Sequence, residues 1–239
     1  MTIKELAYTA QQHLESITGS SFKRAHIYEL LASSFGFKSY AALCPHYVFT
    51  QRENDRSIPA QHQTILQTRV VELGYDPIAT DVAASAFLTF VSEQHIDVVG
   101  IADLVDGLSD DDRFSEEFWT SPDSGEYPLI LLESLEEKAS KGDPLAHYAL
   151  ALLFKNDDED SSQETGGDYW YSQEQQGRVL TGVEKEWADE HARHLEKSEK
   201  HAFHLREAGR LGNSSALLEL AALSHDASYF DAAKASGIT

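Results

Sequence analysis

The feature that most constrains the fold of this chain is a stretch that occurs twice. Residues 136–154 read EEKASKGDPLAHYALALLF, and residues 206–224 repeat the pattern more loosely as REAGRLGNSSALLELAALS. At an offset of 70 residues five positions agree: Gly142/Gly212, Ala146/Ala216, Leu150/Leu220, Ala151/Ala221 and Leu153/Leu223. A chain that repeats one helix-turn-helix unit is expected to stack the copies into a repeat fold.

The shared positions have a physical reason. Glycine at a helix end adopts the left-handed conformation that other residues resist, and Asp143 or Asn213 directly after it can cap the next helix. Ala146 and Ala216 permit close helix packing, and leucines at helical spacing fill the seam. Each copy is therefore predicted to form two helices joined by a tight turn.

The pattern resembles the Sel-one-like repeat, a short α/α unit related to tetratricopeptide repeats. The resemblance covers about a third of the chain and implies a concave surface, lined by the first helix of each repeat, that holds another protein. Since repeats of this class usually recur at roughly 34 to 45 residues, we interpret the longer spacing as an insertion, with a lost middle repeat as the alternative. The residues that carry the resemblance are Ala139, Gly142, Asp143, Ala146, Leu150, Ala151 and Phe154, and then Gly212, Asn213, Ala216, Leu220 and Ala221.

The insertion, residues 156–182, is acidic and lacks a helical period. Its first part, residues 156–168, holds six acidic residues and no basic one, which predicts a mobile loop. Three consecutive aromatic residues follow: Tyr169, Trp170 and Tyr171. They are either a plug folded back on their own domain or an element that recognises a partner.

The N-terminal region predicts helices at residues 3–17 and 22–35. Ile3, Leu6, Ala7, Ala10, Leu14 and Ile17 share one face of the first helix. Gly19 and Gly36 are expected to end the two helices, and Ser20 or Ser21 to cap the second.

Residues 29–45 resemble a small helical module found ahead of various domains in bacterial proteins, some of them glyoxalase-related. The resemblance rests on Leu31, Ala32, Gly36, Phe37, Ser39, Tyr40, Ala42 and Leu43 and implies no catalytic residues. The same order of elements occurs in DNA-binding helix-turn-helix motifs. A second helix that must stop before Pro45 would be only ~9 Å long, which favours a packed helical corner.

The middle of the chain predicts further helices. Residues 48–57 are polar and patternless, which indicates a linker. Helices are expected at 60–73, 78–94, 98–108 and 127–141. For the segment before residue 100, a short strand at 96–99 is the alternative to the helix at 98–108. The core residues expected in the helix at 60–73 are Ile65, Leu66, Val70, Val71 and Leu73. Residues 109–126 form an acidic connector anchored by Phe114, Phe118 and Trp119. We therefore expect an all-α protein with a helical module at 1–56, a helical segment at 57–126 and a repeat region at 127–239.

Charge and cysteine content limit the partners and the compartment. The net charge is −21, but residues 1–70 carry seven basic and five acidic residues, so the acidity lies beyond them. The negative electrostatic field of these residues favours a basic protein partner over nucleic acid or a membrane. A high net charge also keeps a protein soluble. The single Cys44 provides no disulfide framework, and no secretory signal or long apolar stretch is seen, so we expect a cytoplasmic bacterial protein.

Four histidines of one predicted helix form the strongest candidate for chemistry. His191, His194, His201 and His204 fall on a face about 140° wide. Because the pattern contains neither a cysteine ligand nor an HExxH sequence, we expect a solvated face and no metal. The sequence also lacks catalytic-triad, phosphate-loop and dinucleotide motifs, so neither an enzyme nor a cofactor is predicted.

The expected function is that of a non-catalytic protein–protein interaction adaptor. The candidate partner-binding residues are the aromatic triplet Tyr169, Trp170 and Tyr171, and exposed positions of the repeat helices at His147, Tyr148, Leu217, Leu218 and Glu219. Two alternatives remain: a nucleic-acid-binding regulator that uses residues 1–56, and an acidic mimic or immunity protein that blocks a basic partner. Steep salt dependence would indicate the mimic, and a nucleic acid retained on purification the regulator.

Overall fold

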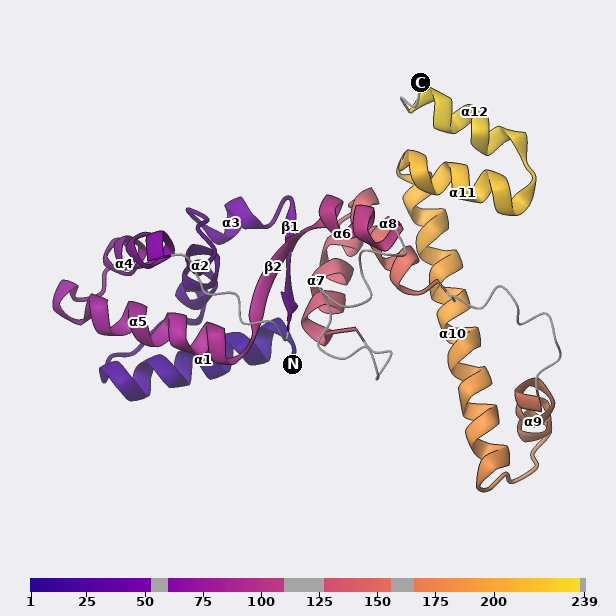
Figure 1. Ribbon diagram of the computed structural model, residues 1–239, viewed down its shortest axis with the longest axis horizontal. Coiled ribbons are helices and arrows are strands. Elements are labelled where there is room, and N and C mark those ends of the chain that lie inside the picture. Colours follow the sequence, from indigo (N-terminus) through magenta and orange to yellow (C-terminus); the bar gives the residue numbers. More distant parts are fainter. Residues whose placement is uncertain (53–59, 110–126, 156–165, 237–239) are drawn as a thin grey trace. The chain divides into compact units, whose positions relative to one another are not determined.

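A computed structural model describes residues 1–52, 60–109, 127–155 and 166–236 (Figure 1). These residues form twelve helices and two strands, so the fold is mostly helical as expected. The chain divides into two compact units, Met1–Lys138 and Ala139–Thr239. Among the helices described, none has the length and apolar character needed to cross a membrane.

The first unit begins with a well-defined pair of helices. Helix α1 (Ile3–Thr18) starts at a capping box between Thr2 and Glu5 and ends at Gly19, whose φ is 66°. Ile17 was expected on the buried face but is exposed, because the buried stripe ends at Leu14. Helix α2 (Arg24–Ser34) has no side-chain cap at Lys23. The expected serine cap is wrong, since the Ser21 hydroxyl donates to Glu15 instead, at 3.2 Å.

Helix α3 (Tyr40–Leu43) is a single turn after Gly36. Its cap is Ser39, whose Oγ accepts the N–H of Ala42 at 3.1 Å. The element is thus even shorter than expected and forms a corner against α2.

The remaining helices of the first unit are α4 (Ala60–Glu72), α5 (Pro77–Glu93), α6 (Ile101–Ser109) and α7 (Leu129–Ser140). The last two residues of α7 lie beyond the boundary between the units. Helix α5 packs on α1 and α4, and α4 packs on α2. One apolar core runs through residues on both sides of the boundary that we expected after residue 56; it includes Leu6, Leu14, Leu31, Phe49, Leu66, Phe87 and Ile130. Of the expected core residues of α4, Val71 is exposed and Leu66 and Val70 are buried.

Two strands interrupt the helices of this unit. Strand β1 (Tyr47–Gln51) pairs antiparallel with β2 (Ile96–Gly100), and Phe49 lies opposite Val98. The predicted linker is therefore wrong for residues 48–51. The alternative of a short strand at 96–99 is confirmed, and the helix expected from Val98 begins only at Ile101. The local sequence pattern does not reveal this pairing, because the hydrogen-bond partners of each strand lie in a segment that is distant along the chain. Residues 53–57 of the predicted linker and the anchors Phe114, Phe118 and Trp119 lie outside the described residues.

The second unit is built around one long helix. Helix α10 (Val183–Arg210) packs against α8 (Pro144–Leu153), α9 (Gly166–Gln175) and α11 (Ser214–Ser224), and α11 packs against α12 (Ala227–Ala235) (Figure 1). The prediction of a loop without helix is wrong for residues 166–175. Helix α9 lacks an apolar period, and polar side chains make part of its contacts with α10: Glu174 accepts from Lys185 at 2.6 Å, and Asp168 lies 3.7 Å from His191.

The turns of the two sequence copies have the predicted geometry. Gly142 and Gly212 have φ values of 84° and 89°. Asp143 accepts the N–H of Ala146 at 3.1 Å, and Asn213 accepts the N–H of Ala216 at 2.9 Å. Both alanines are fully buried. The copies differ toward the end of the second helix, where Leu153 is buried and its counterpart Leu223 is exposed.

Candidate functional site

The repeat-helix residues that we expected at an exposed binding face lie largely inside the second unit. His147, Tyr148 and Leu217 are buried, and Leu218 and Glu219 are half-buried. The expectation of exposure is therefore wrong for the first three. Tertiary contacts bury these side chains, because α10 packs against both α8 and α11.

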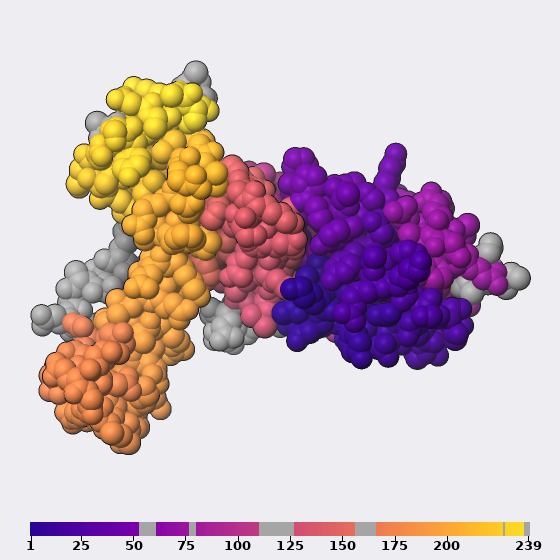
Figure 2. Space-filling view, turned by 180° about the vertical axis from the view of Figure 1, so that it is seen from behind, coloured from indigo at the N-terminus to yellow at the C-terminus, as the bar shows by residue number. Residues whose placement is uncertain are grey.

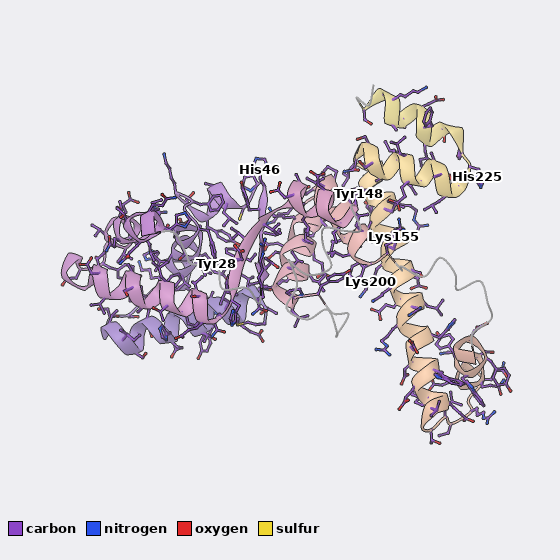
Figure 3. All side chains as sticks on the ribbon, viewed as in Figure 1. Tyr28, His46, Tyr148, Lys155, Lys200 and His225 are labelled. Atoms are coloured by element: carbon purple, nitrogen blue, oxygen red, sulfur yellow. The ribbon has the colours of Figure 1, made fainter. Side chains whose placement is uncertain are left out.

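Glu219 links α11 to the end of α8. Its carboxylate lies 3.2 Å from the ammonium of Lys155 and 3.5 Å from the hydroxyl of Tyr148. Figure 3 labels Tyr148 and Lys155 at α8 and Lys200 on α10; the Lys200 ammonium lies over the ring of Phe154, 5.1 Å from its centroid. These contacts join the end of α8 to α11 and α10, so this cluster positions the helices.

The four histidines of α10 do not form the solvated face that we expected. His201 donates from Nδ1 to the carbonyl of Ala151 at 2.8 Å, and His204 Nδ1 lies 3.0 Å from His147 Nδ1. Near the other end of the helix, His191 contacts Asp168 and the ring of Tyr171. Most of this face is thus used for contacts with α8 and α9.

The environment of His204 opposes its protonation. Burial, with smaller contributions from the nearby His147 and Lys200, lowers the pKa of His204 to about 4. The described residues contain no group of three potential metal ligands. His204 is therefore neutral at pH 7, where it contacts His147 between α8 and α10.

The aromatic triplet lies on α9, where the rings of Tyr169 and Trp170 pack edge to face with centroids 5.0 Å apart. Tyr171 faces His191, with ring centroids 5.4 Å apart. The guanidinium of Arg178 lies over the ring of Trp170, 4.8 Å from the centroid of that ring. Tyr169 is 56% exposed. Two members of the triplet thus help to hold α9 in place, and Tyr169 is available to a partner.

Apolar side chains that the sequence analysis did not single out join Tyr169 at this end of the unit. We define the hairpin surface as the four exposed side chains on α9, on the start of α10 and on the turn between them: Tyr169, Val179, Val183 and Trp187. Trp187 lies against Gly166, where a Cβ would come within 3.2 Å of the indole ring. The spacing of Val183 and Trp187, four residues apart on α10, is the signal that could have found these two.

Buried and charged residues define the setting of this surface. Leu180 and Ala188 are buried beneath it. Residues 166–193 contain six acidic and three basic residues, and Lys185 is already paired with Glu174 and Asp189. Figure 2 shows this end of the second unit in orange. The hairpin thus presents apolar side chains within an acidic field.

Comparisons with known protein families, with characterised proteins and with solved structures found no match to this chain.

Proposed function

We propose that this chain is a non-catalytic adaptor of the Sel-one-like repeat type, and that the hairpin surface binds a basic protein partner. The observation that carries the proposal is the exposure of Tyr169 and Trp187, at 56% and 48%, on two helices that brace each other. Large aromatic side chains with few rotatable bonds lose little entropy on binding and dominate the energy of many interfaces.

Charge decides the kind of partner. The surplus of carboxylates around the hairpin surface attracts a basic protein and repels nucleic acid. Apolar side chains inside a charged rim are also the usual arrangement of a protein interface. The residues at the seam, above all His147, Tyr148 and Leu217, serve this function by fixing α10 rather than by contacting the partner.

The experiment compares one hairpin variant with a matched control. Tyr169→Ala removes the most outward aromatic ring of α9, and Tyr8→Ala removes a similarly exposed tyrosine from α1 in the first unit. Proteins retained by the wild-type chain in extracts of its native cell are identified, and the affinity of a purified candidate is then measured for each variant. We expect the Tyr169 variant to weaken binding by roughly tenfold or more, as interface aromatics do, while the Tyr8 variant binds normally.

Equal affinities of both variants for a purified partner would contradict the proposal, as would a partner without a basic surface. Trp187→Ala provides a second test, provided that circular dichroism shows α10 to be intact. Retention of a nucleic acid would instead favour the regulator.

Salt dependence distinguishes the acidic mimic from the adaptor. A mimic held by charge alone loses its partner steeply between roughly 50 and 500 mM salt, where screening becomes strong. Binding that depends on Tyr169 retains an apolar contribution at the upper concentration. A complex that is abolished by salt and indifferent to Tyr169→Ala would identify the mimic.

A further inference from the structure

A pocket of about 750 Å³ lies within the first unit, far in sequence from the hairpin surface. Its walls come from the beginning of α1, from α2, from α3 and from α7. Pockets that bind small ligands typically measure roughly 300 to 1,000 Å³. The lining residues that matter for its chemistry are Lys4, Tyr28, Glu29, Tyr40, Glu133 and the neighbouring pair Glu136 and Glu137.

Two tyrosine rings form one wall of the pocket. The centroids of Tyr28 (labelled in Figure 3) and Tyr40 lie 5.3 Å apart, with the ring planes tilted by 57°. Glu29 holds this wall in place, because its carboxylate accepts the backbone N–H of Tyr40 at 3.2 Å and also pairs with Arg69. The charge of Glu29 is therefore met by the protein itself.

Carboxylates of α7 also line the pocket. Glu133, Glu136 and Glu137 share one face of this helix by their spacing. Glu133 accepts the backbone N–H of Ile3 at 2.8 Å and lies 3.6 Å from the Lys4 ammonium. The Lys4 side chain is 81% exposed, so this ammonium is held loosely. Lys4 is the one cationic residue among the lining residues, against four glutamates.

The pKa values of both tyrosines of the pocket are raised. Burial is the main factor that raises the pKa of Tyr28; Glu133 and Glu137 raise it as well, against the opposing effects of Arg24 and Lys4. Burial also raises the pKa of Tyr40, and Glu137 again contributes in the same direction. Glu137 thus lies close enough to act on both phenol groups, and the four lining glutamates favour a cationic ligand over an anionic one.

We propose that this pocket binds an organic ammonium group carried on an alkyl chain. The nitrogen would lie between the carboxylates of α7 and the faces of Tyr28 and Tyr40, because tyrosine rings attract cations and carboxylates accept their N–H groups. The alkyl chain would lie against Ile3 and Ala25, which supply apolar lining. The contact between Lys4 and Glu133 shows that an ammonium already fits beside one of these carboxylates.

The same chemistry has two possible sources: a free alkyl diamine, or a lysine side chain of another protein. The inference does not rest on the hairpin surface, which belongs to the other unit. Failure of one proposal therefore leaves the other unchanged.

The test uses the full chain and calorimetric titration with 1,5-diaminopentane. The neutral 1,5-pentanediol has the same length and serves as the ligand control. A blocked pentapeptide with one central lysine, and its norleucine analogue, represent the protein source. We expect at least one cationic probe to bind and both neutral analogues to fail. Binding of the diamine alone would indicate a free amine, and binding of the lysine peptide alone a protein partner.

Substitutions then locate the site. Glu136→Gln and Glu137→Gln should each weaken binding by about tenfold, the usual effect of losing a charged hydrogen-bond acceptor. Tyr28→Leu should weaken it several-fold by removing the cation–π contact. Glu93→Gln changes an exposed carboxylate of α5 that does not line the pocket, and it should bind as the wild type does. Equal binding of the neutral analogues, unchanged affinity in both α7 variants, or no binding of either cationic probe at millimolar concentration would overturn the proposal.

Discussion

The Nδ1 atoms of His147 and His204 lie 3.0 Å apart and join α8 to α10. In a hydrogen bond between two imidazoles one nitrogen donates its proton and the other accepts it. Two charged rings cannot make this contact. The interface between α8 and α10 therefore depends on at least one neutral histidine.

This pair predicts that the second unit loses stability in acid. The pKa of His204 is lowered to about 4, mainly by burial, whereas an unfolded histidine titrates near 6.5. As the pH falls from about 6.5 to about 4, the unfolded chain takes up this proton before the folded one, so the free energy of unfolding decreases. For a half-buried ring, screened by solvent, we expect a loss of about 1 to 2 kcal/mol. Urea unfolding at several pH values measures it.

His204→Gln removes the titrating ring and should flatten this part of the pH profile. His225→Asn is the control, because His225 is the exposed left-handed residue that ends α11. If the His204 variant kept the full acid dependence of the wild type, the acid sensitivity would have another source.

The buried alanines predict the effect of overpacking. Ala146→Trp or Ala216→Trp places an indole where the methyl group is fully enclosed, so each should lower the free energy of unfolding by about 1 to 3 kcal/mol or more. Ala222→Trp, at an exposed position of α11, should have little effect. Equal melting temperatures for all three variants would refute the assignment of both alanines to the packed seam.

The glycine turns predict a smaller, purely conformational cost. Gly142→Ala and Gly212→Ala add a methyl group into open space, yet the backbone φ values there are strained for alanine. Each substitution should cost about 1 kcal/mol. Asparagine tolerates this conformation better, so Gly142→Asn should cost less than Gly142→Ala. Thermal unfolding that ranks the two in the opposite order would contradict the left-handed turn.

Zinc or nickel should raise the melting temperature at pH 7 by no more than about 2 °C. His201 and His204 already use their Nδ1 atoms in contacts with α8, so a metal would have to compete with these hydrogen bonds. Thermal scans with and without added metal test this. A stoichiometric metal that survives dialysis would show that the histidines bind an ion after all.

Some features followed from local sequence. The turns at Gly142 and Gly212, the caps at Asp143 and Asn213, and the buried Ala146 needed no knowledge of distant residues. Each of these features depends on residues within one turn or one helix. Glycine relieves backbone strain at the turn, the cap accepts the N–H three residues further on, and the alanine lies within a stripe of leucines on the same helix. The helical class followed for the same reason, since the apolar period of α1 spans a single element.

Other features were decided by tertiary contacts alone. Strand β1 exists because β2 supplies its hydrogen bonds, and α9 forms although its sequence has no apolar period, because Lys185 and His191 of α10 meet its polar face. Packing against α10 also buried His147, which the pattern had placed on a binding face. The sequence by itself thus determined where helices turn and end, and tertiary structure decided which faces remain open, because exposure depends on neighbours that lie far away along the chain.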